Sequence, residues 1–264
     1  MTGTRIAAAF AKARAEGRPA LIPYLTAGDP SLLATRALVT ALARGGADLV
    51  EIGVPFSDPI ADGPVNQRAA ERALRNGVTL RSVLDLAAGL RKESLPPVVL
   101  FTYYNPIHRM GIAAFAHEAR AAGVDGVLVT DLPPEEADDL RSALDAAGVD
   151  LIFLLSPTSS KERIARIARD GRGFLYVISR TGVTGAKEDV PDGLSDLVGA
   201  VRLASRLPVA VGFGISRPEQ VREVAAYADG VVVGSALVRL IEEAAEAPDL
   251  PGRVEAFCRA LVGR

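Results

Sequence analysis

The sequence predicts a (β/α)8 barrel, also called a TIM barrel, as a single domain over residues 1–264. Eight short runs rich in Val, Ile and Leu recur along the chain, and segments with a helical 3.6-residue apolar period separate them. Strands that alternate with helices form a parallel sheet, and eight such units in about 250 residues match a closed barrel. An open doubly wound sheet is the alternative, but no Gly-x-Gly-x-x-Gly fingerprint follows the first run.

The elements follow in chain order. The expected strands are the apolar runs at residues 20–26, 48–54, 98–103, 126–131, 150–155, 174–179, 209–213 and 230–234. Helical periodicity is clearest at residues 32–44, 113–122, 135–147, 161–169, 194–206 and 218–226, and another helix follows Ser235 directly. Extra helices are expected at the N-terminus (residues 4–16), after the second strand (66–75) and at the C-terminus (253–261).

The turns before several strands share the pattern Gly-x-Asp, at residues 46–48, 123–125 and 148–150. A looser copy, Ala-Asp-Gly, lies at residues 228–230. Glycine readily ends a helix, and an aspartate that enters a strand suits a helix-to-strand loop. The repeat therefore marks a helix-turn-strand unit.

Composition excludes several classes of function. The net charge of −2 gives no basic excess, so we expect no nucleic-acid partner and no binding to an anionic membrane surface. A single cysteine, Cys258, excludes an internal disulfide and favours a cytoplasmic location. His108 and His117 have no partners at metal-ligand spacing, so no metal site is expected. No signal peptide and no run of 18 apolar residues is visible, so no membrane span is expected.

Candidate catalytic residues lie in the second strand and the loop after it. Glu51 interrupts an apolar run, where an unpaired carboxylate must find a partner or change its pKa. Asp58 and Asp62 follow in a loop rich in Pro and Gly. Because active sites of this fold lie at the C-terminal ends of the strands, Glu51 and Asp62 are candidates for an acid/base pair. The structural alternative makes Glu51 an ion-pair partner of an arginine, and the two aspartates turn formers.

The ends of the last strands suggest a phosphate site. Gly212 and Gly214 follow the seventh strand, and Gly234 and Ser235 lead from the eighth strand into a helix. Backbone amides at such glycines and at a helix N-terminus bind anions without a basic side chain. Alternatively, the glycines only form turns.

A long loop and several aromatic side chains complete the predicted site. The loop at residues 179–193 exceeds about 12 residues, and we expect it to act as a lid. Tyr24, Tyr103, Tyr176 and Phe213 favour a flat apolar ligand, although each one alone could simply fill the barrel.

Four segments together resemble the signature segments of the tryptophan synthase alpha chain family. The most specific is Glu-Ile-Gly-Val-Pro-Phe-Ser-Asp-Pro-Ile-Ala-Asp-Gly-Pro at residues 51–64, and the others lie at 23–30, 179–185 and 212–216. The resemblance covers essentially the whole chain. It implies a retro-aldol cleavage of indole-3-glycerol phosphate to indole and glyceraldehyde 3-phosphate, without a cofactor on this chain.

The resemblance also implies roles for individual residues. Glu51 would be the general acid/base, and Asp62 would bind the indole N–H. Thr184 of the lid would hold Asp62, and Tyr176 would lie near Glu51. The substrate phosphate would contact Gly185, Gly214, Gly234 and Ser235. The indole pocket would be formed by Tyr24, Phe101, Tyr103, Leu128 and Phe213, where Tyr24 and Phe101 depart from the Phe and Leu common in the family.

A partner follows from the same resemblance. The alpha chain would dock on a beta chain that carries pyridoxal phosphate (PLP), in an αββα heterotetramer. The expected contacts are Asp58, Pro59 and Asn105, with Ile60, Ile107 and Met110 as apolar side chains in loops. Two alternatives remain: a stand-alone lyase that releases free indole, and a non-enzymatic scaffolding subunit, which the presence of both Glu51 and Asp62 disfavours.

Overall fold

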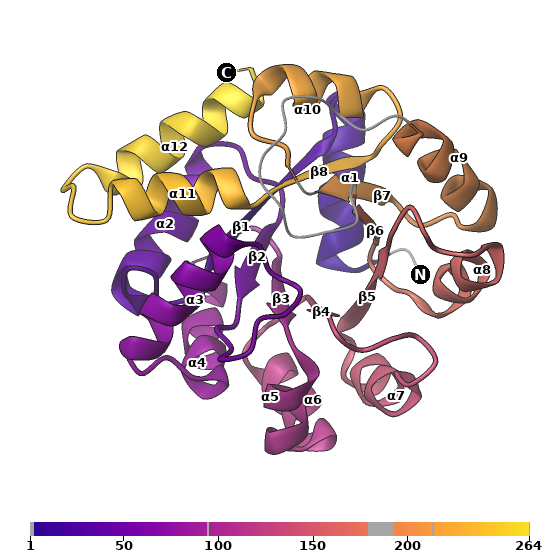
Figure 1. Cartoon of the computed structure of the whole chain (residues 1–264), viewed down its shortest axis with the longest axis horizontal. Coiled ribbons are helices and arrows are strands. Elements are labelled where there is room, and N and C mark those ends of the chain that lie inside the picture. Colours follow the sequence, from indigo (N-terminus) through magenta and orange to yellow (C-terminus); the bar gives the residue numbers. More distant parts are fainter. Residues whose placement is uncertain (1–2, 94, 179–192, 213, 264) are drawn as a thin grey trace.

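The computed structural model describes residues 3–93, 95–178, 193–212 and 214–263. Within these ranges eight parallel strands form a closed barrel in the order β1-β2-β3-β4-β5-β6-β7-β8, surrounded by helices (Figure 1). The first strand pairs with the last, with Ala20 opposite Gly230, so the sheet has no open edge. The predicted barrel is confirmed, and the doubly wound alternative is wrong.

Each of the eight predicted strands is present, several of them shortened by one to three residues. They are β1 (Ala20–Thr26), β2 (Val50–Gly53), β3 (Val98–Thr102), β4 (Gly126–Val129), β5 (Asp150–Leu155), β6 (Leu175–Ile178), β7 (Val209–Gly212) and β8 (Gly230–Val233). All four residues of β2 are buried, Glu51 included. This double-sided burial explains why the strands appear in the sequence as continuous apolar runs.

The helices of the described residues are α1 (Arg5–Ala15), α2 (Leu32–Arg44), α3 (Pro64–Arg75), α4 (Leu80–Arg91), α5 (Tyr104–Met110), α6 (Ile112–Ala121), α7 (Asp138–Ala147), α8 (Lys161–Asp170), α9 (Leu194–Ala204), α10 (Pro218–Ala225), α11 (Ser235–Glu243) and α12 (Leu250–Leu261). Two of them, α4 and α5, fall outside the predicted set. A capping box formed by Thr79 and Ser82 opens α4. The amide of Tyr104 at the start of α5 donates instead to Asp131, 27 residues away, at 2.7 Å.

The N-terminal end of the barrel is closed. Ile6 and Phe10 of α1 belong to the cluster that fills the barrel interior, together with Leu49, Leu128 and Phe174. The rings of Phe10 and Phe174 lie 5.5 Å apart. A ligand therefore reaches the interior from the opposite end, where the strands have their C-termini.

The repeated aspartates of the turns have a structural role at this closed end. Asp48, Asp125 and Asp229 each accept a hydrogen bond at 2.9 Å from a backbone amide at the start of the preceding strand. The same three carboxylates pair with arginines from α1 or the segment after it: Arg18 with Asp48, Arg5 with Asp125 and Arg14 with Asp229. The repeat therefore attaches α1 to the rim of the barrel.

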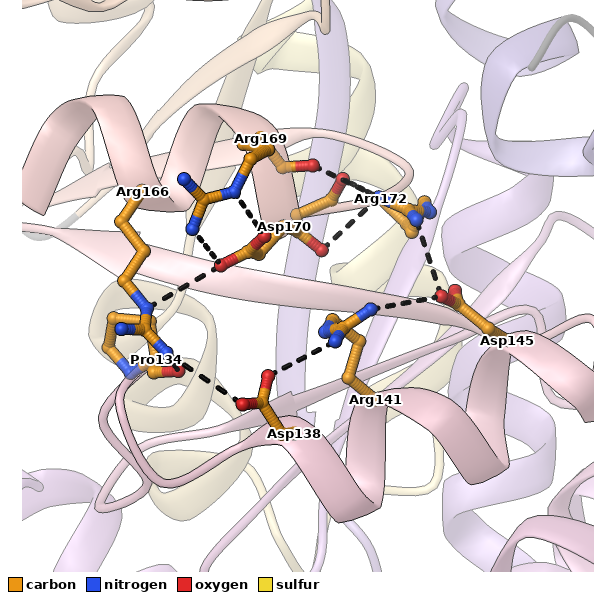
Figure 2. Close-up of polar contacts among 9 residues, drawn as sticks. Pro134, Asp138, Arg141, Asp145, Arg166, Arg169, Asp170 and Arg172 are labelled. Carbon is orange, nitrogen blue, oxygen red and sulfur yellow. Dashed lines mark hydrogen bonds and ion pairs between the residues drawn. The ribbon is translucent and has the colours of Figure 1, made fainter.

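A second group of charges joins α7 to α8 (Figure 2). The arginines are Arg141, Arg166, Arg169 and Arg172, and the aspartates are Asp138, Asp145 and Asp170. In the same view Arg166 reaches the loop before α7, where it donates to the carbonyl of Pro134 at 3.1 Å. Most of these side chains are partly buried, and the bond from Arg166 to Pro134 joins α8 to the loop before α7.

Candidate active site

A cavity of about 960 Å³ lies at the C-terminal ends of the middle strands. Its apolar wall includes Phe101, Val129, Phe153, Leu154 and Ile178, which come from β3, β4, β5 and β6. Ile60 and Ala61, from the loop after β2, line another side. The cavity therefore has the position expected of a barrel active site, although Glu51 and Asp62 are not among its lining residues.

Glu51 lies in the barrel interior without any exposed surface. It is opposite Tyr24 in β1 and opposite Val99 in β3. Among the described residues neither carboxylate oxygen has a hydrogen-bond partner. Loss of water around the charged form raises the pKa of Glu51 to about 8. This geometry gives no support to the alternative in which Glu51 is an ion-pair partner.

Asp62, in contrast, is held by neighbours on three sides. The Tyr103 hydroxyl donates to its carboxylate at 2.8 Å and accepts from the amide of Ala61 at 3.0 Å. Asn66, in the first turn of α3, also forms a hydrogen bond with the carboxylate. The Gln67 side chain donates to the Asp62 carbonyl at 2.9 Å. Burial raises the pKa of Asp62, while the hydrogen bonds from Tyr103 and Asn66 act in the opposite direction.

Two of the predicted pocket tyrosines depend on glycines in neighbouring strands. A Cβ atom on Gly53 would overlap the hydroxyl of Tyr24, and one on Gly212 would overlap the hydroxyl of Tyr176. Gly212 therefore makes room for a tyrosine, a role different from the phosphate contact considered for it. The Tyr24 hydroxyl lies 3.3 Å from the hydroxyl of Thr26, near the carboxyl groups of Glu51 and Asp62.

The remaining indole-pocket candidates line the same interior. Tyr24 and Phe101 pack edge to face, with their ring centres 5.3 Å apart. Leu128 is fully buried in the interior cluster, next to them in the barrel. Tyr103 faces the loop after β2, where it pairs with the ring of Phe56 at 5.0 Å and with Asp62.

The described residues that are predicted to bind phosphate, Gly214, Gly234 and Ser235, follow the adjacent strands β7 and β8. Gly214 has a φ of +85°, a conformation that favours glycine. Gly234 is the N-cap of α11, and no side chain caps this helix. The first amides of α11, beginning at Ser235, therefore have no acceptor within the helix and can bind an anion. At the neighbouring helix α10, by contrast, Gln220 already accepts from the amides of Ser216 and Arg217.

Three predicted site residues, Thr184, Gly185 and Phe213, lie outside the described residues, as does most of the predicted lid at residues 179–193. The residues predicted to contact a partner differ in exposure. Asp58 and Asn105 are exposed, Pro59 is half-buried, and Ile60 is 72% exposed.

The expectation that Ile107 and Met110 are loop residues is wrong. Both belong to α5, and Ile107 is fully buried in the hydrophobic core. Met110 is partly buried and packs against the same core. Their apolar character therefore serves the packing of α5, because a helix buries one face against the barrel.

Sequence reasoning missed one wall of the cavity. The loops after β4 and β5 supply Thr130, Asp131, Leu132, Pro133, Pro134, Glu135, Ser156, Thr158, Ser159 and Ser160. The Pro-Pro pair and the cluster of hydroxyl residues, each directly after a strand, were the available signals. Within the described residues no group of His, Cys, Asp and Glu has the arrangement of a metal site. None of the described helices combines the length and the apolar character needed to cross a membrane.

Comparison with known proteins places this geometry in a family. The tryptophan synthase alpha chain family profile matches residues 10–261. The tryptophan synthase alpha chain of Geobacter sulfurreducens is 53% identical, over 98% of this chain and 97% of its own length. That of Solibacter usitatus is also 53% identical, with the same coverage of 98% and 97%.

Solved structures agree with the sequence relatives. The crystal structure of tryptophan synthase subunit alpha from Legionella pneumophila has a TM-score of 0.89 and 40% identity, covering 98% of this chain and 97% of that one. A chain of Mycobacterium tuberculosis tryptophan synthase has a TM-score of 0.91 and 40% identity, with coverage of 99% and 98%. The chain therefore belongs to the tryptophan synthase alpha chain family.

Proposed function

We propose that this chain is a lyase that catalyses the alpha reaction of tryptophan synthase. It cleaves indole-3-glycerol phosphate to indole and glyceraldehyde 3-phosphate. The family supports the reaction. The observation that carries the mechanism is the carboxylate of Glu51, which is buried and unpartnered among the described residues of the barrel interior. Groups of this kind with a strongly changed pKa are typical of acid/base catalysts.

In the first step, Glu51 donates a proton to carbon 3 of the indole ring. Its pKa of about 8 keeps the acid protonated at neutral pH, so the proton is available. Protonation converts the ring to an indolenine cation with its positive charge at the ring nitrogen. The carboxylate of Asp62 accepts a hydrogen bond from the ring N–H and stabilises that positive charge as it develops.

In the second step, the C–C bond between the ring and the side chain breaks. The carboxylate of Glu51 takes the proton of the hydroxyl on the adjacent side-chain carbon, and that carbon becomes the aldehyde. The bonding electrons return to the ring, which restores neutral indole. Glu51 ends the cycle protonated, so one residue moves both protons and none is lost.

Binding contacts at the two ends of the substrate orient it for these steps. The free amides at the N-terminus of α11, with Gly214 and the Ser235 hydroxyl, bind the phosphate. The indole ring occupies the apolar interior beside Tyr24, Phe101 and Leu128. The family resemblance assigns Thr184 to a contact with Asp62 and Gly185 to the substrate phosphate. These assignments follow from the family resemblance, and Phe101 also lines the cavity described above.

We also propose that the partner is a tryptophan synthase beta chain, in an αββα heterotetramer. PLP belongs to that partner, and the reaction of this chain uses no cofactor. The exposed side chain of Ile60, beside Asp58 and Pro59 and on the same face of the barrel as Asn105, supports an interface at the barrel mouth. The second candidate, a stand-alone lyase, differs only in releasing free indole.

The test is a product assay with indole-3-glycerol phosphate, run with and without a beta chain. We expect indole release, enhancement by the beta chain, and loss of at least about 100-fold in kcat for Glu51→Gln and for Asp62→Asn, with an unchanged circular dichroism spectrum. The exposed Glu243→Gln serves as a control. Near-normal turnover of either variant would refute its role, and full activity of the chain alone would favour the stand-alone lyase.

A further inference from the structure

Helices α3 and α11 lie side by side on the outside of the barrel, and ion pairs join them (Figure 1). Arg68 of α3 donates to both carboxylate oxygens of Glu242 in α11, at 2.8 Å each. One turn further along α3, Arg72 donates to the same carboxylate at 2.7 Å. Glu242 thus accepts hydrogen bonds from two guanidinium groups of one neighbouring helix.

Arg72 extends the contact to a third element. It donates through Nε and Nη2 to the two oxygens of Asp29, at 2.8 Å each. Asp29 is 2% exposed and lies in the loop directly after β1. A planar guanidinium that is bidentate on one carboxylate and bonded to another leaves little freedom of movement between the elements it joins. The network therefore fixes α3, α11 and the loop after β1 relative to one another.

The joined helices begin at opposite ends of the proposed substrate site. Asp62 directly precedes Gly63, the N-cap of α3. Ser235 is the first residue of α11, the helix assigned to the phosphate. The distance from the phosphate amides to the Asp62 carboxylate therefore depends on how the two helices are held together, and Glu242 supplies the charged contact between them.

We propose that Glu242 is a positioning residue for the cleavage reaction, which through Arg68 and Arg72 sets the distance between the phosphate-binding end of α11 and Asp62. The inference rests on the proposed function. A substrate anchored by its phosphate must present its indole N–H to Asp62, and a displacement of about 1 Å in such a contact costs up to about 100-fold in rate. Ligands that occupy only one end of the site do not depend on this distance.

Glu242 is the residue of this network that can be changed without leaving a buried carboxylate unpaired. The Glu242 side chain is 24% exposed, and its two arginines are 51% and 28% exposed. The hydrogen bonds from Arg68 and Arg72 lower the pKa of Glu242 to about 2, so the carboxylate stays charged at neutral pH. Removal of Arg72 would leave the buried Asp29 without its partner, whereas removal of the Glu242 carboxylate keeps that pair intact. Glu242 is therefore the residue to change.

The experiment compares Glu242→Met with Glu243→Met, a neighbouring, exposed glutamate of the same helix. The kcat and KM for indole-3-glycerol phosphate and the Kd for glycerol 3-phosphate are measured for both variants. For Glu242→Met we expect kcat to fall about 5- to 30-fold, with KM and Kd within about 2-fold of wild type. Glu242→Gln should recover most of kcat, since its amide oxygen still accepts from Arg72. The control variant should match wild type.

Other outcomes separate the possible failures. Unchanged kcat in Glu242→Met would overturn the proposal. So would a Kd for glycerol 3-phosphate that weakens as much as kcat/KM, because Glu242 would then support the phosphate site alone. A fall in kcat that is explained by the unfolded fraction in urea titrations would also overturn it. A wild-type chain that releases no indole would instead refute the proposed function.

Discussion

The substitution Glu51→Gln tests the central electrostatic feature of this barrel through stability as well as activity. In the folded chain the pKa of Glu51 is about 8, against an ordinary value of 4.5. Between these two pH values the folded state keeps a proton that the unfolded state has released. The free energy of unfolding therefore falls as pH rises, by about 1.4 kcal/mol per pH unit from this one group.

The contribution of the Glu51 proton to the free energy of unfolding follows from the interval between the two pKa values. It is fully present below pH 4.5 and is lost as pH rises toward about 8, for a total of about 4 to 5 kcal/mol. Solvent screening does not reduce the effect, because Glu51 has no exposed surface. Glutamine has nearly the same shape and does not ionise. We therefore expect the free energy of unfolding of Glu51→Gln, relative to wild type, to rise with pH. The difference should grow from below about 1 kcal/mol at pH 5 to about 3 kcal/mol at pH 7.

Urea unfolding at pH 5, 6, 7 and 8, followed by circular dichroism, measures this difference. Because other groups also titrate in this range, the relevant quantity is the variant midpoint minus the wild-type midpoint at each pH. Glu243→Gln removes an exposed carboxylate and should give a difference that does not change with pH. A constant difference for Glu51→Gln between pH 5 and pH 8 would refute the assignment of a neutral buried acid. The same variant should lose its lyase activity at every pH.

Three further substitutions test other parts of the structure. Tyr103→Phe removes a hydrogen bond from Asp62, so the pKa of Asp62 should rise and the acidic limb of kcat/KM should shift upward by about 1 pH unit. An unshifted limb would contradict the effect of the Tyr103 hydroxyl on Asp62. Gly53→Ala should destabilise the chain by about 1–3 kcal/mol in urea titrations, because the methyl group overlaps the Tyr24 hydroxyl. Adding Tyr24→Phe should restore part of the loss. A Gly53→Ala variant as stable as wild type would exclude the overlap. Asp125→Ala removes contacts at the closed end of the barrel and should lower the free energy of unfolding by about 1–3 kcal/mol, while kcat per folded molecule stays unchanged. A lower kcat would show that this end influences the site.

Much of the fold was predictable because each unit carries its own local signals. The apolar runs reflect burial of the strands on both faces, and the Gly-x-Asp turns mark where α6 and α7 end and the next strands begin. Helix α5 escaped prediction because the group that caps its first amide, Asp131, comes from a different loop. The burial of Ile107 was not predictable either, because an apolar residue near Asn105 and Pro106 resembles an exposed loop residue until the helix that buries it is known.

The sequence by itself determined the barrel, the family and the carboxylates Glu51 and Asp62 as candidates, because these follow from periodicity and from short contiguous motifs. Only the tertiary structure decided how the surroundings of these two carboxylates differ. Glu51 has no hydrogen-bond partner among the described residues and a raised pKa, whereas the phenol of Tyr103, 41 residues away, holds Asp62. Likewise, Glu242 meets its arginines only because closure of the barrel brings α11 beside α3. Desolvation and long-range hydrogen bonds depend on what surrounds a group in space, which adjacent residues in the chain do not specify.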